Sequence, residues 1–149
     1  MTRPSASATR ACYFKLGSYY FAAESLFVKQ IIPVKTFSPV PRSCASLWGL
    51  IAVDSAILPL INSYEIFGLP KTETDLAIVL EQDNKLMALA LDEVLGFAPL
   101  EADYQQVTEE LPTALKPLSK GTAFYQDKTF DVLDIQRLLS LVEHQLEVV

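Results

Sequence analysis

Three pairs of short apolar segments, each joined by a tight turn, constrain the fold of this chain most. In chain order they are residues 12–16 and 19–23 around Gly17-Ser18, residues 76–80 and 86–91 around Asp83-Asn84, and residues 122–125 and 129–133 around Gln126-Asp127-Lys128. Gly17 supplies the positive φ of a type II′ hairpin turn, and Asp83-Asn84 suits the second turn. Short strands at this spacing predict a mainly β chain built from barrels or a sandwich.

Two more strands and one helix complete the pattern. Residues 50–53 and 56–61 are predicted strands, and Pro59 removes a ladder donor, which indicates an edge strand or a bulge. Residues 25–31 fit either a strand or a helical turn, and residues 33–42 and 68–75 are predicted loops. A C-terminal helix is predicted because its apolar residues fall at i, i+3, i+4, i+7 and i+11, with Asp134 as the N-cap; they are Ile135, Leu138, Leu139, Val142 and Leu146.

Charge is distributed unevenly along the 149 residues. The net charge is −6, but residues 1–42 carry six basic residues and one acid, and residues 43–149 carry six basic residues and seventeen acids. Nucleic acid is therefore an improbable ligand, and a protein partner with a complementary charge pattern fits better. The longest apolar stretch, residues 47–61, is interrupted by Asp54 and Pro59 and is shorter than the ~20 residues of a membrane span, so no membrane insertion is expected.

Residues that carry chemistry are few. Cys12 and Cys44 with the single His144 cannot form a four-ligand zinc site without carboxylates; two reduced thiols are favoured, with one disulfide as the alternative. No GxSxG or phosphate-binding glycine motif occurs, and His144 lies off the apolar stripe, as expected for a solvated histidine near a helix C-terminus. Of two adjacent carboxylate pairs, Asp92-Glu93 would point to opposite faces of a strand and so makes a poor acid–base dyad, and Glu109-Glu110 is expected to be solvated in a loop. We therefore predict no catalytic residue, no metal and no cofactor.

Five segments, read in order, resemble the CheW-like domain, the adaptor of bacterial chemosensory arrays. They are YFKLGSYYFAAESLFVKQII, FSPVPRSCASLWGLI, AILPLIN, AIVLEQDNKLMALALDEVLGF and GTAFYQDKTFDVLDIQRLL. The resemblance covers about six-sevenths of the chain, residues 12–139, and depends on order and spacing more than on any single motif. It places one CheW-like domain at residues 12–149, after a short disordered tail at residues 1–11.

The resemblance implies two small five-stranded SH3-like β-barrels packed together, with a C-terminal α-helix, and no catalysis. It also implies binding to the cytoplasmic tip of methyl-accepting chemoreceptors and to the regulatory domain of a CheA-type histidine kinase. The partner-contacting positions of the family fall on Val28, Gly49, Leu76, Val94 and Phe97. Packing in the core is the alternative for the apolar members of this set.

The chain departs from the family pattern at several positions. Ala52-Val53-Asp54-Ser55 stands where the family usually has Asn-Leu-Arg-Gly, so Asp54 changes the local charge by two units. If that arginine pairs with a carboxylate of the partner, Asp54 repels the same partner, which makes it a sixth candidate binding residue. Asn62 replaces the usual aspartate, and Asp131 occupies a strand position that is usually apolar.

These features predict a cytoplasmic, non-enzymatic adaptor in a chemotaxis or pilus-motility signalling complex. The first alternative is a CheW-like interaction module with an exchanged partner, such as a non-standard kinase, receptor or regulator, that no longer enters receptor–kinase rings. A second alternative, from another class, is a small-ligand barrel or an enzyme that uses His144.

Overall fold

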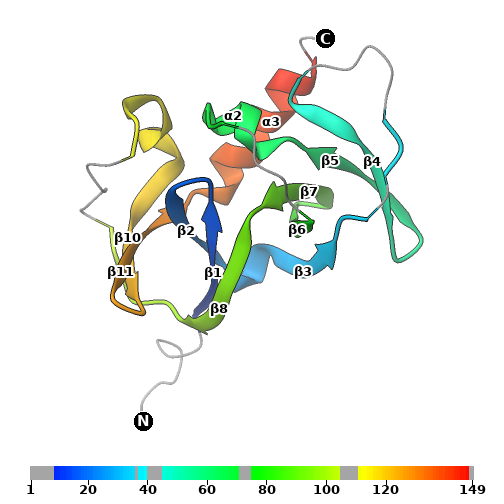
Figure 1. Cartoon of the computed structure of the whole chain (residues 1–149). Helices are drawn as coiled ribbons and strands as arrows, with labels where there is room; N and C mark the ends of the chain where they lie inside the picture. Colours follow the sequence, from blue (N-terminus) through cyan, green and yellow to red (C-terminus); the bar gives the residue numbers. More distant parts are fainter. Residues whose placement is uncertain (1–8, 36, 40–44, 71–74, 105–110, 148–149) are drawn as a thin grey trace.

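The computed structural model describes residues 9–35, 37–39, 45–70, 75–104 and 111–147. These residues form two β-sheets, with short helical turns between strands and one longer helix, α3 (Ile135–Glu147), at the C-terminal end (Figure 1). The prediction of a mainly β fold with a C-terminal helix is confirmed. The strands of the five-stranded sheet, β3 to β7, are consecutive in the chain, whereas the six-stranded sheet combines β1 and β2 with β8 to β11.

The first sheet has six strands in the order β8-β1-β2-β11-β10-β9. It is antiparallel except for the β2–β11 pair, which is parallel. The two-residue β9 adds one strand to the five that were predicted. The strand bounds are β1 Arg10–Leu16, β2 Tyr19–Glu24, β8 Glu93–Pro99, β9 Ala102–Asp103, β10 Ser119–Tyr125 and β11 Lys128–Leu133.

The second sheet has five strands in the order β3-β6-β7-β5-β4. Here the β5–β7 pair is parallel and the other pairs are antiparallel. The strand bounds are β3 Val28–Pro33, β4 Leu47–Val53, β5 Ala56–Ile61, β6 Leu76–Gln82 and β7 Lys85–Leu91. Short helical segments connect the elements: η1 Ser25–Phe27, α2 Ser63–Phe67 and η2 Thr113–Leu118.

Each sheet encloses a small core of its own. In the six-stranded sheet the core includes Tyr13, Ala22, Ala123, Phe130 and Val132, together with partly buried residues of β8 and β9. Tyr13 stacks on Tyr125 with ring centroids 4.3 Å apart. A Cβ at Gly96 of β8 would overlap the hydroxyl of Tyr125, which belongs to β10. The sheet is therefore curved enough to bring a β10 side chain against β8. In the five-stranded sheet, a second small core draws side chains from all five strands.

The largest core lies between the two sheets. The faces of β1, β2, β6 and β7 that point away from the two small cores line this larger core. Residues of α2, η2 and α3 fill the remaining space. The apolar stripe predicted for α3 is confirmed, because Ile135, Leu138, Leu139 and Val142 are buried. The backbone N–H of Arg137 donates to Asp134 Oδ1 at 3.1 Å, which confirms the predicted N-cap. Figure 1 shows α3 passing between the two groups of strands.

The hairpin turns agree with the sequence, and one is tighter than predicted. Gly17 has φ 62°, as a type II′ turn requires at its first central position. Lys128 belongs to β11, so the β10–β11 turn has two central residues instead of three. Three turns have positive φ at both central residues, as in type I′; the pairs are Asp54-Ser55, Asp83-Asn84 and Gln126-Asp127.

Two expectations need correction. β1 begins at Arg10, so Arg10 and Ala11 belong to a strand and not to the tail expected over residues 1–11. β5 lies between β7 and β4, so the edge strand inferred from Pro59 is wrong. The β4–β5 pair does have a register shift, but it falls between Leu47 and Gly49 and not at Pro59. Leu50, opposite Pro59, directs its backbone N–H and C=O to Ser38, and the β5–β7 ladder begins only at Leu60. The backbone nitrogen of Pro59 therefore points toward the β7 side of β5, where ladder pairing begins only at the next residue, so no hydrogen bond is lost there.

Among the described residues, no helix is both long and apolar enough to cross a membrane.

Candidate partner-binding site

The six candidate residues divide between the two sheets. Val94 and Phe97 lie on β8, an edge strand of the six-stranded sheet. The other four belong to the five-stranded sheet: Val28 on β3, Leu76 on β6, Gly49 on β4 and Asp54 in the β4–β5 turn. They therefore do not form one compact patch.

Core packing accounts for part of this set. Val28, Leu76 and Val94 are half-buried and pack against the core between the sheets. Phe97 differs, because its side chain is 46% exposed on the edge strand. The guanidinium of Arg10 donates to the Phe97 carbonyl oxygen at 3.3 Å, so β1 supports the backbone beneath this ring. Of the two β8 residues, Phe97 is the one whose side chain remains largely accessible to another molecule.

Gly49 is buried because a neighbouring segment lies directly against it. A Cβ at this position would overlap the Ser38 carbonyl oxygen and come within 2.8 Å of the Phe37 ring. Ser38 forms two backbone hydrogen bonds with Leu50, of 2.9 and 2.8 Å, and these bonds hold the segment along β4. The glycine therefore permits close packing within the chain, which gives it a structural role whether or not a partner also contacts it.

Replacing Gly49 with Ala is expected to lower the free energy of unfolding by about 1–3 kcal/mol, the usual cost of overpacking. The added methyl group meets the Ser38 backbone as well as the Phe37 ring, so the Ser38–Leu50 bridge must shift. Urea unfolding followed by circular dichroism measures the change. Ala52→Ser, at an exposed position of the same strand, is the control and should stay within about 0.5 kcal/mol. Equal stability of the two variants would contradict the close packing.

Asp54 lies at the tip of the β4–β5 hairpin and is exposed. Its Oδ2 accepts a hydrogen bond of 3.2 Å from Gln30 Nε2 of β3, which is the interaction the structure gives this carboxylate. Ser55 follows with φ 70°, a conformation that favours glycine. The glycine that is usual at position 55 in the family pattern is therefore explained by backbone conformation, and Ser55 adopts the same conformation at some cost.

An apolar strip on the outer face of this hairpin was missed from the sequence. Opposed residues of an antiparallel pair share a face, and the register places Leu50 opposite Pro59 and Ala52 opposite Ile57. Leu50 is 39% exposed and Ile57 is 66% exposed. The opposite face of the same hairpin is core. The strand sequences are apolar at successive positions, so alternation gave no signal for which residues point outward.

Two of the unusual polar residues have structural roles. Asn62 caps α2: its Oδ1 accepts from the Glu65 N–H, and its Nδ2 donates to the Ala45 carbonyl oxygen at 3.2 Å. An ionised aspartate could not make the second bond, which explains the amide here. Asp131 is only 4% exposed on β11 and accepts a 2.8 Å hydrogen bond from Ser119 Oγ of β10. This partner compensates part of the cost of burying a carboxylate in the sheet.

The carboxylates considered for acid–base chemistry are separated. Asp92 accepts a hydrogen bond from the Tyr64 hydroxyl of α2, whereas Glu93 is exposed. Glu109 and Glu110 lie outside the described residues. A different acid, Glu24, is 9% exposed at the end of β2 and forms an ion pair with Lys120 of β10. This ion pair joins two strands of the six-stranded sheet.

The remaining reactive groups are unremarkable for catalysis. Burial raises the pKa of the Cys12 thiol to about 12, so the thiol stays protonated at neutral pH. Cys12 is free, and Cys44 lies outside the described residues. Parts of the predicted loops at 33–42 and 68–75 also lie outside them. His144 is exposed on α3, as predicted. Within the described part of the chain, no three His, Cys, Asp or Glu residues gather in a way that would hold a metal ion.

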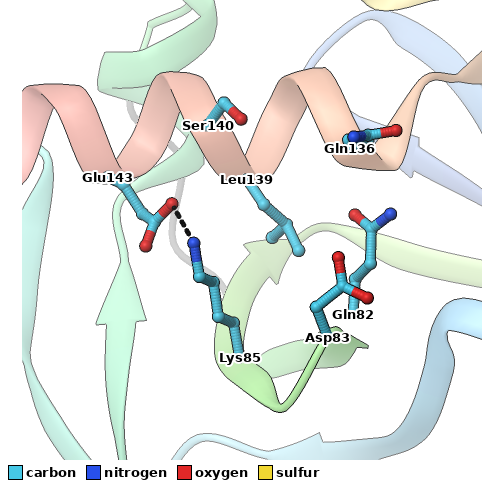
Figure 2. A pocket seen from close by; sticks show the side chains of 7 residues that line it. All are labelled: Gln82, Asp83, Lys85, Gln136, Leu139, Ser140 and Glu143. Atoms are coloured by element: carbon cyan, nitrogen blue, oxygen red, sulfur yellow. Dashed lines mark hydrogen bonds and ion pairs between the residues drawn. The ribbon is translucent and has the colours of Figure 1, made fainter.

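A shallow groove of about 100 Å³ lies between the β6–β7 turn and α3. Figure 2 shows the Lys85 ammonium paired with Glu143 at 2.9 Å at one side of it. The other lining residues are Gln82, Asp83, Gln136, Leu139 and Ser140. Because its one cation is already paired and a further carboxylate faces the same space, the groove does not offer a binding site for an anion.

Comparison with known proteins identifies the class to which this fold belongs. The family model of the CheW-like domain matches residues 10–143. The chain therefore belongs to the CheW-like domain family, whose members serve as scaffolds and adaptors.

Individual relatives agree with the family match. The chain is 22% identical over 145 residues to a protein described as "Chemotaxis protein CheW" of Treponema pallidum (strain Nichols), covering 89% of this chain and 82% of that protein. Its fold is similar to the crystal structure of the scaffolding protein TtCheW from Thermoanaerobacter tengcongensis, with a TM-score of 0.69 and 20% identity. That likeness covers 85% of this chain and 88% of TtCheW, and it concerns the fold alone.

Proposed function

We propose that this protein is a non-enzymatic adaptor that couples chemoreceptors to a CheA-type histidine kinase in a chemotaxis or pilus-motility complex. The family match over residues 10–143 carries this proposal. The same complex would place the protein in the cytoplasm, beside the receptor tips and the kinase.

The candidate contacts lie on both sheets. Phe97 on β8 presents an exposed ring, with half-buried Val94 on the same strand. Val28, Leu76 and Gly49 shape the five-stranded sheet, and Asp54 is the charged residue at its hairpin tip. An interface with apolar anchors and a polar rim is typical of protein recognition. These residues therefore form the proposed partner-binding set.

Titration calorimetry against the regulatory domain of a CheA-type kinase from the same genome tests the adaptor role. We expect saturable binding with a Kd on the order of micromolar, about 8 kcal/mol of binding free energy. Phe97→Ser should weaken it, while Phe124→Ser, which removes a more exposed ring from β10, serves as the control. A well-folded sample that binds neither this domain nor a receptor tip would contradict the proposal.

The second candidate function is a CheW-like interaction module with an exchanged partner, outside receptor–kinase rings. Asp54 favours it, since a carboxylate stands where the family pattern has arginine. Binding to a non-standard kinase or regulator, combined with no binding to the regulatory domain of a CheA-type kinase, would select this alternative.

A further inference from the structure

Asp92 is the only residue between β7 and β8, so it alone links the five-stranded sheet to the six-stranded sheet at this crossing. Its backbone N–H donates to the Lys15 carbonyl oxygen of β1 at 3.0 Å. The position of Asp92 therefore determines where β8 begins alongside β1.

Main-chain pairing holds the beginning of β8 only weakly. β8 is an edge strand, so β1 is its one strand neighbour. The pairs Glu93–Lys15 and Val94–Phe14 are followed directly by a register shift in the β1–β8 ladder. A shift of this kind leaves a residue unpaired and bends the strand. Side-chain contacts at the crossing therefore have a large influence on how this end of β8 is placed.

α2 lies against the crossing and holds it with two buried side chains. The Tyr64 hydroxyl donates to Asp92 Oδ1. The Ser63 hydroxyl donates to the Ala90 carbonyl oxygen, near the end of β7. Tyr64 is 1% exposed, and its ring lies 6.2 Å from the ring of Trp48 in β4. Because a hydrogen bond to a carboxylate is stronger than one between neutral groups, the contact from Tyr64 fixes Asp92 firmly.

We propose that Tyr64 is a positioning residue for β8, because its hydroxyl holds the Asp92 carboxylate and thereby fixes the direction in which the chain enters the six-stranded sheet. Without this hydrogen bond the beginning of β8 separates more readily from β1, while both sheets remain folded. The inference goes beyond the proposed function, since it concerns the placement of the strand that carries Val94 and Phe97, whatever molecule that strand contacts.

A matched control lies at the other end of the same strand. The Tyr13 hydroxyl donates to the Pro99 carbonyl oxygen at 3.0 Å, and the next residue, Leu100, donates its N–H to a backbone carbonyl oxygen at 3.0 Å. Tyr13→Phe therefore removes the same group from a buried ring as Tyr64→Phe does. The two backbone amides that report on these ends of β8 are those of Leu100 and Asp92.

Native-state amide exchange followed by NMR tests the proposal on the full chain without any partner. In Tyr64→Phe we expect the Asp92 amide to exchange about tenfold or more faster, relative to the amides of β6 and β7, because a hydrogen bond to a charged group is lost. Tyr13→Phe should accelerate Leu100 and leave Asp92 within about twofold on the same scale. A hydroxyl that only stabilised the whole fold would accelerate all of these amides by one factor.

Variants of Asp92 test the same hydrogen bond from its other side. Asp92→Asn keeps an oxygen that accepts from Tyr64, so protection at position 92 should stay within about threefold, whereas Asp92→Ala should lose as much as Tyr64→Phe. Fluorescence of Trp48, the single tryptophan, verifies that the substituted ring stays in place, and Asp92→Ala decides the question if Tyr64→Phe does not fold.

Two results would overturn the inference. One is exchange at position 92 that rises no more than exchange in β6 and β7 when the hydrogen bond is removed. The other is an Asp92 amide that shows no protection in the unchanged protein. Neither result bears on the titration with the kinase domain, so the failure of this inference and the failure of the proposed function are distinguishable.

Discussion

Asp54→Arg is expected to tighten binding about tenfold to a CheA-type regulatory domain whose own adaptor carries arginine at this position. The side chain projects from an exposed turn, so the substitution acts at the interface and not in the core. A like-charge contact becomes an opposite-charge contact, and charge pairs of this kind contribute roughly 1.5 kcal/mol or more when they are close. Calorimetry with the foreign domain measures the change.

The same variant is expected to lose affinity for a partner that presents a cation to Asp54. The two effects have opposite signs, which separates a change of partner preference from general damage to the surface. Arginine fits a φ of 46° less well than aspartate, so Asp54→Arg combined with Ser55→Gly relieves backbone strain at the tip and serves as the folding control. Unchanged or weaker binding to the foreign domain, from a folded variant, would contradict the charge argument.

The second large effect concerns stability. Leu138→Ala is expected to lower the free energy of unfolding by about 2–5 kcal/mol, because this side chain is fully buried on α3 between the two sheets. The core around it includes residues of both sheets, so we expect a single cooperative transition in which both sheets unfold together. Urea unfolding monitored by circular dichroism, with amide exchange as a probe of each sheet, measures this.

Gln136→Ala provides the control for that substitution. The position is exposed on the same helix, and its replacement should change stability by no more than about 0.5 kcal/mol. Two separate transitions in Leu138→Ala, or loss of protection in one sheet only, would show that the shared core does not couple the sheets.

Much of the fold could be predicted from the sequence, because hairpins and α3 are local structures with local signals. Asp83-Asn84 and Gln126-Asp127 lie in turns with positive φ, and Asp134 caps the helix. β8 and α2 were not predicted. Gly96 and Pro99 interrupt the strand pattern of β8, and α2 has only five residues, too few for a helical period to appear.

The candidate site was less accessible to sequence reasoning. Asp54 lies between two predicted strands, so the sequence could place it in a turn. The exposure of the side chains on those strands, however, depends on which face of each strand another element covers. Ile57 and Leu58 are both apolar neighbours on β5, yet Ile57 is 66% exposed and Leu58 only 4%. Pairing partners, which are distant in sequence, decide this difference. The division of the six candidates between two sheets likewise followed only from the sheet order.

The β4–β5 turn also bears on how related adaptors avoid one another. Its two central residues are held by the strands in a fixed backbone conformation, and neither side chain at the tip is needed in the core. The charge at this tip can therefore be reversed while the two sheets keep their packing. If the proposed function holds, a reversal of charge at this tip would keep adaptors of one fold from joining the wrong receptor–kinase assembly, since like charges across an interface disfavour the wrong partner.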